Sequence, residues 1–291
     1  MIIPPYLQAG DTLAIIATAR KISLPELEPA CQWLREQGYQ LKLGQSIGAE
    51  DRQFAGSDEL RRADLQEQLN DPEVKAILCA RGGYGSVRLV DGLVWDRFMQ
   101  QPKWICGYSD ITVLHAELQK RHTASIHSTM PLNFESSSAS LRSWESLDRA
   151  LKGKHLVYDL SKLHFERGTE MEAEVIGGNL SVIYSLMGSN SLPDFRGKIL
   201  FLEDLDEYLY HVDRMMMCLK RAGVLSQLAG LLVGGLTKMN DNAIGFGRTA
   251  EQILLEAVAP YDYPIAFGFP AGHQPLNQSI RLGMPLRITS Q

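Results

Sequence analysis

Residues 104–112 read WICGYSDIT, an apolar run that ends at a glycine, presents a serine and leads into a helical pattern. A sharp turn of this kind between a strand and a helix lifts the side chain of Ser109 above the carboxyl edge of a parallel sheet. The next backbone N–H and the N-terminus of the helix then face any negative charge that develops on a substrate. The stretch therefore predicts a nucleophile elbow, although position 111 lacks the second glycine of the full Gly-x-Ser-x-Gly pattern. The alternative is that Ser109 only caps the helix.

Strand-like and helix-like stretches alternate on both sides of this turn. Short stretches typical of strands occur at residues 12–17, 39–43, 75–80, 104–106 and 124–126. Amphipathic helices are expected between them, and two of these begin near Ser23 and Ser57. Strands that alternate with helices form β-α-β units and a parallel sheet. We therefore expect an α/β protein with an N-terminal flavodoxin-like or Rossmann-like domain and a smaller C-terminal α/β domain with a mixed sheet.

The serine-rich stretch at residues 135–140 is the most linker-like part of the chain. It leads us to expect an N-terminal domain over residues 1–140, a linker or crossing segment over residues 141–168 and a C-terminal domain over residues 169–291. Within the C-terminal domain, strands are expected at residues 172–176, 198–202, 231–233 and 264–267.

Two turns are expected in the C-terminal domain. Gly177-Gly178 is predicted to end a strand, with Asn179 as the cap of the next helix. Residues 279–282 and 285–288 are predicted to pair as a hairpin about Gly283-Met284.

Composition excludes several classes of protein. A chain of 291 residues with 45% hydrophobic and 22% charged residues is typical of a globular protein of one or two domains. A net charge of -5 argues against a nucleic acid or an anionic membrane as partner. The four cysteines never form a Cys-x-x-Cys pair, so neither a zinc site nor a disulfide framework is indicated. Neither a signal peptide nor an apolar stretch of ~20 residues is recognisable, and we expect a cytoplasmic location.

A reactive serine needs a base and an acid from elsewhere in the chain. His273 is the best candidate base because it follows a strand in the loop Gly-Phe-Pro-Ala-Gly, whose small residues can aim a side chain. Glu203 is the best candidate acid because it follows directly on the predicted buried strand 198–202 and does not lie on the helix that comes after it. The chain order of serine, acid and histidine is one that serine hydrolases use. Taken singly, Glu203 could be a helix N-terminal charge and His273 an ordinary loop histidine.

Two further loops are expected at the same edge of the sheet. Residues 81–85, RGGYG, fit neither the dinucleotide fingerprint nor the P-loop, and their backbone N–H groups suit an oxyanion hole. A tight turn that requires positive φ would explain the same glycines. His127 begins the other loop and could contact substrate, or it could be a structural hydrogen-bonding group.

Six motifs taken together resemble the LD-carboxypeptidase family, the muramoyltetrapeptide carboxypeptidases to which the microcin-immunity peptidases are related. The motifs occur in the family's order and with similar spacing over nearly the whole chain: residues 81–85, 107–110, 176–181, 200–204, 213–215 and 268–273.

The resemblance implies a serine peptidase with the triad Ser109, Glu203 and His273. It also implies an oxyanion hole from the backbone N–H groups of Gly83 and Asp110, and neither a metal nor another cofactor. The implied reaction removes the terminal D-alanine of a murein tetrapeptide by cleaving an L,D bond, as part of peptidoglycan recycling, in a homodimeric enzyme. We further expect three residues to contact the substrate: Tyr84, His127 and Asn179.

One departure from the family and several alternatives stay open. The family commonly has His-Gly-Pro-Met where this chain has HSTM at residues 127–130, which puts the shape of the substrate pocket in question. The physiological substrate could instead be a microcin-type peptide conjugate. The chain could also be an amidase-like transferase, or a binding module that captures a peptide or an amino acid without catalysis. The sequence does not identify the diamino acid that precedes the scissile bond.

Overall fold

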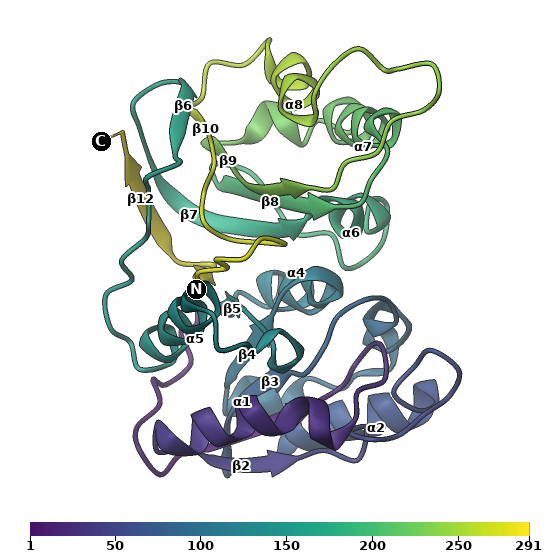
Figure 1. Cartoon of the computed structure of the whole chain (residues 1–291), viewed down its shortest axis with the longest axis vertical. Helices are drawn as coiled ribbons and strands as arrows, with labels where there is room; N and C mark the ends of the chain where they lie inside the picture. Colours follow the sequence, from purple (N-terminus) through teal and green to yellow (C-terminus); the bar gives the residue numbers. More distant parts are fainter. Residues whose placement is uncertain (291) are drawn as a thin grey trace.

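Residues 1–290, the part of the chain that the computed structural model describes, form two six-stranded sheets that lie one above the other (Figure 1). The first sheet has the strand order β11-β5-β4-β3-β1-β2. Its strands are β1 (Thr12–Ile16), β2 (Gln40–Leu43), β3 (Val74–Cys79), β4 (Trp104–Gly107), β5 (Ser125–His127) and β11 (Ile280–Leu282). Strands β1 to β5 are parallel, which confirms the prediction of a parallel N-terminal sheet.

Helices cover both faces of this sheet. They are α1 (Leu24–Glu36), α2 (Asp58–Asn70), α3 (Asp96–Gln100), α4 (Thr112–Lys120) and α5 (Ser138–Leu151), with short 3-10 helices η1 (Ser86–Arg88), η2 (Val90–Gly92), η3 (Ser109–Ile111) and η4 (Pro131–Asn133). Alternate residues of β1 enter different cores: Leu13 and Ile15 pack with α1 and α5, whereas Ala14 and Ile16 pack with α2 and α4. A strand that is buried on both faces consists of apolar residues throughout, which is why β1 could be predicted from the sequence.

Helix α5 begins inside the stretch that was expected to be a linker. The serines there cap the helix, because the Ser137 hydroxyl accepts a hydrogen bond from the Ser140 N–H. Farther along, Trp144 and Leu147 are fully buried in the core shared with α1. The apolar period of α5 thus outweighs its polar first turn, and we propose that the first domain extends at least to Leu151.

The second sheet has the order β12-β7-β8-β9-β10-β6, with β7 to β10 parallel and both edge strands antiparallel. This is the expected mixed sheet. Its strands are β6 (His164–Arg167), β7 (Glu170–Asn179), β8 (Ile199–Leu205), β9 (Gly230–Thr237), β10 (Ile265–Phe267) and β12 (Pro285–Thr289). One face is covered by α6 (Leu180–Ser185), α7 (Leu209–Arg221) and α8 (Ala250–Val258), and η5 (Leu225–Gln227) precedes β9.

Two turn predictions for the second half are wrong. Gly177 and Gly178 do not form a turn but continue β7 as far as Asn179, at φ of 128° and 143°. A Cβ on Gly178 would lie 2.5 Å from the Thr112 hydroxyl, so this strand approaches α4 closely. The predicted C-terminal hairpin is not formed either, because β11 pairs with β5 and β12 pairs with β7.

Strand β11 therefore joins the two sheets, since it comes from the C-terminal part of the chain and forms the edge of the first sheet. Figure 1 shows α4 beneath β7 and α6, and the Thr112 hydroxyl accepts a hydrogen bond of 3.0 Å from the Asn179 N–H there. These contacts fix the carboxyl end of β4 relative to the second sheet. Within residues 1–290, every helix is too short or too polar to span a bilayer.

Candidate active site

Ser109 stands on a strained turn at the carboxyl end of β4. Its φ is +65°, a left-handed conformation that a residue with a side chain seldom adopts. Gly107 precedes it at φ +151°, where a Cβ would lie 2.9 Å from Ile111 Cγ1. A strained serine between a parallel strand and a helix is the geometry expected of a nucleophile elbow, and such strain is concentrated at functional sites.

The glycine loop after β3 lies directly against this serine. A Cβ on Gly82 would be 3.0 Å from the Ser109 Cβ and 3.2 Å from its hydroxyl oxygen. Any larger residue at position 82 would thus crowd the serine hydroxyl. The next glycine, Gly83, has φ +112°, and a Cβ there would press on the Arg20 side chain instead. The structure therefore identifies Gly82 as the glycine in contact with Ser109, a role that the run of three glycines did not reveal.

Asp110 joins the serine turn to the glycine loop. Its carboxylate accepts a 2.8 Å hydrogen bond from the backbone N–H of Ser86, and the Ser86 hydroxyl is 2.7 Å from that of Thr18. Burial raises the pKa of Asp110, although the Ser86 N–H donor opposes that shift. The Asp110 carboxylate is thus bound to the start of η1, and the role of the Asp110 backbone N–H in an oxyanion hole stays a prediction.

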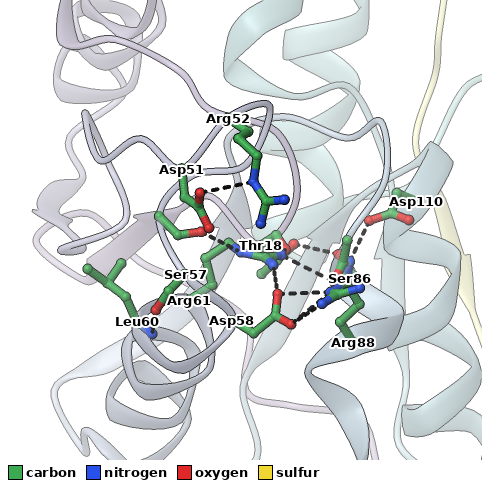
Figure 2. Close-up of polar contacts among 12 residues, drawn as sticks. Thr18, Asp51, Arg52, Ser57, Asp58, Leu60, Arg61, Ser86, Arg88 and Asp110 are labelled. Carbon is green, nitrogen blue, oxygen red and sulfur yellow. Dashed lines mark hydrogen bonds and ion pairs between the residues drawn. The ribbon is translucent and has the colours of Figure 1, made fainter.

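A buried arginine supports the same loop from below. Arg61, on α2, is only 1% exposed, and its guanidinium donates hydrogen bonds to the carbonyl oxygens of Thr18 and Gly85. It also forms an ion pair with Asp58, which in turn pairs with Arg88. Figure 2 shows these contacts converging between α2 and the loop, with Asp110 on the far side of Ser86.

Glu203 and His273 form a close pair on the second sheet. Glu203 lies near the carboxyl end of β8 and is fully buried, whereas His273 follows β10 and is 13% exposed at its side chain. The Glu203 Oε2 lies 2.6 Å from the His273 Nδ1 and accepts a second hydrogen bond of 3.0 Å from the His273 backbone N–H. A carboxylate at Nδ1 favours the tautomer with its proton there, which leaves Nε2 free to accept a proton.

The loop around His273 is shaped to bring this pair together. Gly272 has φ +100°, and a Cβ there would lie 2.6 Å from the Glu203 Cβ. The Gly272 N–H donates a 2.8 Å hydrogen bond to the Asn277 Oδ1. Only glycine allows the loop to pass so close to the carboxylate.

The two halves of the site meet at Tyr108. Its ring lies 4.6 Å from the His273 ring, between centroids, and Tyr108 directly precedes Ser109. No hydrogen bond joins the Ser109 hydroxyl to His273 within the described residues. Hydrogen bonds of this kind often tighten only when substrate binds. The structure thus brings the serine turn and the glutamate–histidine pair to one place, while the hydrogen bond between them remains a prediction.

The three expected substrate contacts lie in different surroundings. Tyr84 is 46% exposed on the glycine loop and open to a ligand. His127 is completely buried beside Tyr108 and Phe201, and burial lowers its pKa well below the ordinary value. Asn179 is 3% exposed, caps α6 and donates a 2.9 Å hydrogen bond to Asp204. His127 thus has no accessible surface and Asn179 is engaged in capping, and substrate contact by these three residues stays a prediction.

Comparison with known proteins identifies the family of this chain. Residues 13–128 match the LD-carboxypeptidase N-terminal domain and residues 172–288 match the LD-carboxypeptidase C-terminal domain. The chain is 35% identical over 278 residues to a probable murein peptide carboxypeptidase of Bacillus subtilis, covering 93% of this chain and 86% of that protein. It is 24% identical over 322 residues to the microcin C7 self-immunity protein MccF of Escherichia coli, covering 97% and 91%.

A solved structure also resembles this chain over nearly its whole length. The muramoyltetrapeptide carboxypeptidase from Oxalobacter formigenes superposes with a TM-score of 0.82 at 25% identity, covering 96% of this chain and 95% of that one. The resemblance noted in the sequence is thus confirmed across both sheets, and the chain belongs to the LD-carboxypeptidase family of serine-type hydrolases.

Proposed function

We propose that the protein is a cytoplasmic carboxypeptidase that removes the terminal D-alanine from murein tetrapeptides released during peptidoglycan recycling. In this proposal Ser109 is the nucleophile, His273 the general base and Glu203 the residue that orients the base. The observation that supports it most directly is the 2.6 Å contact between Glu203 and His273 beside a strained serine turn. The relatives named murein peptide and muramoyltetrapeptide carboxypeptidases support the choice of substrate.

Acylation would begin when the Ser109 Oγ attacks the scissile carbonyl carbon while the His273 Nε2 takes the hydroxyl proton. The carbonyl oxygen becomes an oxyanion in a tetrahedral intermediate. Collapse of this intermediate breaks the C–N bond, and His273 returns the proton to the departing amine of D-alanine. An ester between the shortened peptide and Ser109 remains.

Deacylation would repeat these steps with water. His273 takes a proton from water as the water oxygen attacks the ester carbonyl, and then returns the proton to the Ser109 oxygen as the C–O bond breaks. The buried Glu203 carboxylate stabilises the positive imidazolium in both stages, because its Oε2 already accepts the Nδ1 proton.

The oxyanion would be stabilised by backbone donors at the serine turn. We propose the N–H groups of Asp110 and Gly83, as the family resemblance implies. The contact of Gly82 with Ser109 supports the position of the glycine loop, since it brings this backbone next to the reacting oxygen.

Release of D-alanine from defined tetrapeptides tests the proposal. The parent chain should release D-alanine from a peptide with a terminal L,D bond and none from the L,L isomer. The Ser109→Ala chain should lose turnover by a factor on the order of 10³–10⁶. Near-normal turnover in that variant would refute the assignment of Ser109.

Two further probes separate the alternatives. A fluorophosphonate should label the parent at Ser109 and leave Ser109→Ala unlabelled, whereas a pure binding module would not react. An aminoacyl sulfamoyl nucleoside offered in parallel would reveal a microcin-type preference, and a hydroxylamine trap would reveal acyl transfer to an amine. Hydrolysis of the nucleoside conjugate in preference to the tetrapeptide would overturn the choice of substrate.

A further inference from the structure

The side chain of Arg20 extends across the glycine loop from the neighbouring strand. Arg20 belongs to the loop after β1, and β1 lies next to β3 in the first sheet. A Cβ on Gly83 would lie 2.6 Å from the Arg20 Cδ and 2.9 Å from its Nε, so the arginine covers this glycine. Because the preceding Gly82 contacts Ser109, the Arg20 side chain lies close to the serine turn.

The backbone that carries Arg20 is fixed by its hydrogen bonds. The Thr18 carbonyl oxygen accepts a hydrogen bond from the buried Arg61 guanidinium. The Ala19 carbonyl oxygen accepts one of 3.1 Å from the Ala55 N–H. Thr18 and Ala19 are completely buried, whereas Arg20 is exposed. A fixed loop therefore presents a solvent-exposed cation beside the glycine loop.

Arg20 differs from the other arginines around this loop in having no acceptor for its guanidinium within residues 1–290. Arg81 donates a hydrogen bond of 3.0 Å to a backbone carbonyl oxygen of the loop after β1. Arg52 and Arg88 each form an ion pair with an aspartate, at 3.2 and 2.7 Å. A guanidinium carries five N–H donors in a planar fork that matches a carboxylate. Of these four arginines, Arg20 is therefore the one available to a carboxylate of a ligand.

We propose that Arg20 binds the terminal carboxylate of the substrate and thereby restricts cleavage to the last peptide bond. The inference rests on the proposed function, in which the scissile carbonyl oxygen faces the N–H groups of Gly83 and Asp110. The carboxylate carbon of D-alanine is three bonds beyond the scissile carbonyl carbon, about 3–4 Å away. A terminal carboxylate would thus lie beside the cation that covers Gly83, which would hold it by charge-assisted hydrogen bonds.

Such a contact would select the substrate by the charge at its end. A peptide that continues beyond the cleaved residue, or one whose end is amidated, places a neutral carbonyl where the carboxylate would be. Arg20 would then lose its ionic partner, and binding would be weaker. Carboxylates that precede the scissile bond offer the same chemistry from another part of the peptide, so the test has to separate them from the terminal one.

Two tetrapeptides that differ only in ending in D-alanine or in D-alaninamide test this role. Release of the terminal residue is measured with the parent chain, Arg20→Gln and Arg20→Lys. A second pair of peptides, in which every internal carboxylate is replaced by a carboxamide, separates the terminal carboxylate from the internal ones. Arg52→Gln is the matched control, because it removes the same charge from the loop after β2, where the arginine side chain is 83% exposed.

We expect Arg20→Gln to lower kcat/KM about ten- to fiftyfold for the peptide that ends in D-alanine, and less than about twofold for the amide. The loss should appear mainly in KM, because the carboxylate has the same charge in the bound peptide and in the transition state. Arg20→Lys should recover part of the loss, since it keeps the charge without the planar fork. The second pair should behave like the first, and Arg52→Gln should leave all peptides unchanged.

Equal losses for the acid and the amide would overturn the role, because they would show only a disturbed glycine loop. A loss that disappears in the second pair would assign Arg20 to an internal carboxylate and overturn it too, as would an equal loss in Arg52→Gln. Calorimetric binding of the same peptides to Ser109→Ala, with and without Arg20→Gln, gives the comparison without hydrolysis, and unchanged affinities there would refute the inference. Failure of the parent chain to release D-alanine would refute the proposed function but leave these binding results intact.

Discussion

The buried Arg61 offers a sharp test of how the active-site loop is held. In Arg61→Met the side chain remains long and apolar, but the guanidinium is lost. The carbonyl oxygens of Thr18 and Gly85 then lose their donor, and Asp58 loses one of its two arginine partners (Figure 2). Both carbonyls belong to the segments that position Ser86 and, through it, Asp110.

The expected loss of stability follows from burial. Removing one partner of a buried ion pair costs about 3–5 kcal/mol, mainly because polar groups are left without partners. Asp58 retains Arg88 and is itself partly exposed, so we expect a value near the lower end, about 3 kcal/mol. A domain of ordinary stability, about 5–15 kcal/mol, would still fold.

Arg88→Met is the matched control, because it removes the other arginine partner of Asp58. The Arg88 side chain is 47% exposed, so solvent screens this ion pair and replaces it readily. Urea unfolding should therefore show a large decrease in the free energy of unfolding for Arg61→Met and a small one for Arg88→Met.

The same two variants test function through the rate of fluorophosphonate labelling, measured below the unfolding transition. In Arg61→Met the glycine loop after β3 should no longer hold its backbone N–H groups in place. Labelling of Ser109 should therefore become slower, while the fraction of protein that finally reacts stays the same. The reasoning would be refuted if Arg61→Met cost no more stability than Arg88→Met.

Three further predictions concern the pair on the second sheet and a buried histidine. Glu203→Gln should lower D-alanine release by about 10³–10⁴-fold, because the imidazole loses the carboxylate that sets its tautomer, and a fall below tenfold would contradict that role. Gly272→Ala should lower both turnover and thermal stability, because the added Cβ would lie 2.6 Å from the Glu203 Cβ. Gly188→Ala is the control: Gly188 also has a positive φ, of +80°, but has open space around it, so this substitution should affect stability alone. Equal effects of the two substitutions on turnover would exclude the clash as the cause. Burial lowers the pKa of His115 to about 4. Between pH 6.5 and 4 the unfolded chain therefore binds a proton at this residue that the folded chain does not. The free energy of unfolding should fall on acidification through this range by up to roughly 3 kcal/mol. The urea midpoint of His115→Gln should fall less over the same pH range than that of the parent chain.

The central strands β1, β3, β4 and β5 of the first sheet could be predicted from the sequence because they are almost entirely buried. The run before Ser109 is apolar at every position, and it ends at a glycine whose φ of +151° few other residues adopt. Ser23 and Ser57 marked the starts of two helices correctly, since each stands at the N-cap. Apolar runs and N-cap residues were enough to predict those strands and helices whose position depends on their own residues.

The parts that were predicted wrongly depend on residues far away in the chain. Residues 280–282 and 285–289 alternate like hairpin strands, but their partners are β5 and β7, more than a hundred residues earlier. Gly177 and Gly178 suggested a turn, yet small residues are needed there because the strand passes close to Phe201 and Thr112. Long-range packing of this kind leaves no local pattern.

The candidate site likewise contains some features that could be predicted from the sequence and others that could not. Ser109, Glu203 and His273 each stand next to a strand end that the sequence predicted, so their convergence could be inferred from topology. The contact of Gly82 with Ser109 and the close approach of Gly272 to Glu203 could not, because the first depends on how the loop after β3 packs against the serine turn and the second on how the loop after β10 packs against β8. The residues that shape the site are therefore harder to predict than the residues proposed to perform the chemistry.

The division of the site between two sheets makes their relative position part of the proposed mechanism. Acylation requires the Ser109 oxygen and the His273 Nε2 to come within hydrogen-bond distance, and a displacement of about 1 Å can cost a hundredfold in rate. Strand β11 is paired to β5 and followed directly by β12 in the other sheet, and the Thr112 hydroxyl binds the Asn179 N–H across the same boundary. A hinge opening between the sheets would have to break these contacts. The remaining freedom lies in the loops, so substrate is expected to complete the hydrogen bond between Ser109 and His273 by local adjustment of the serine turn and the His273 loop.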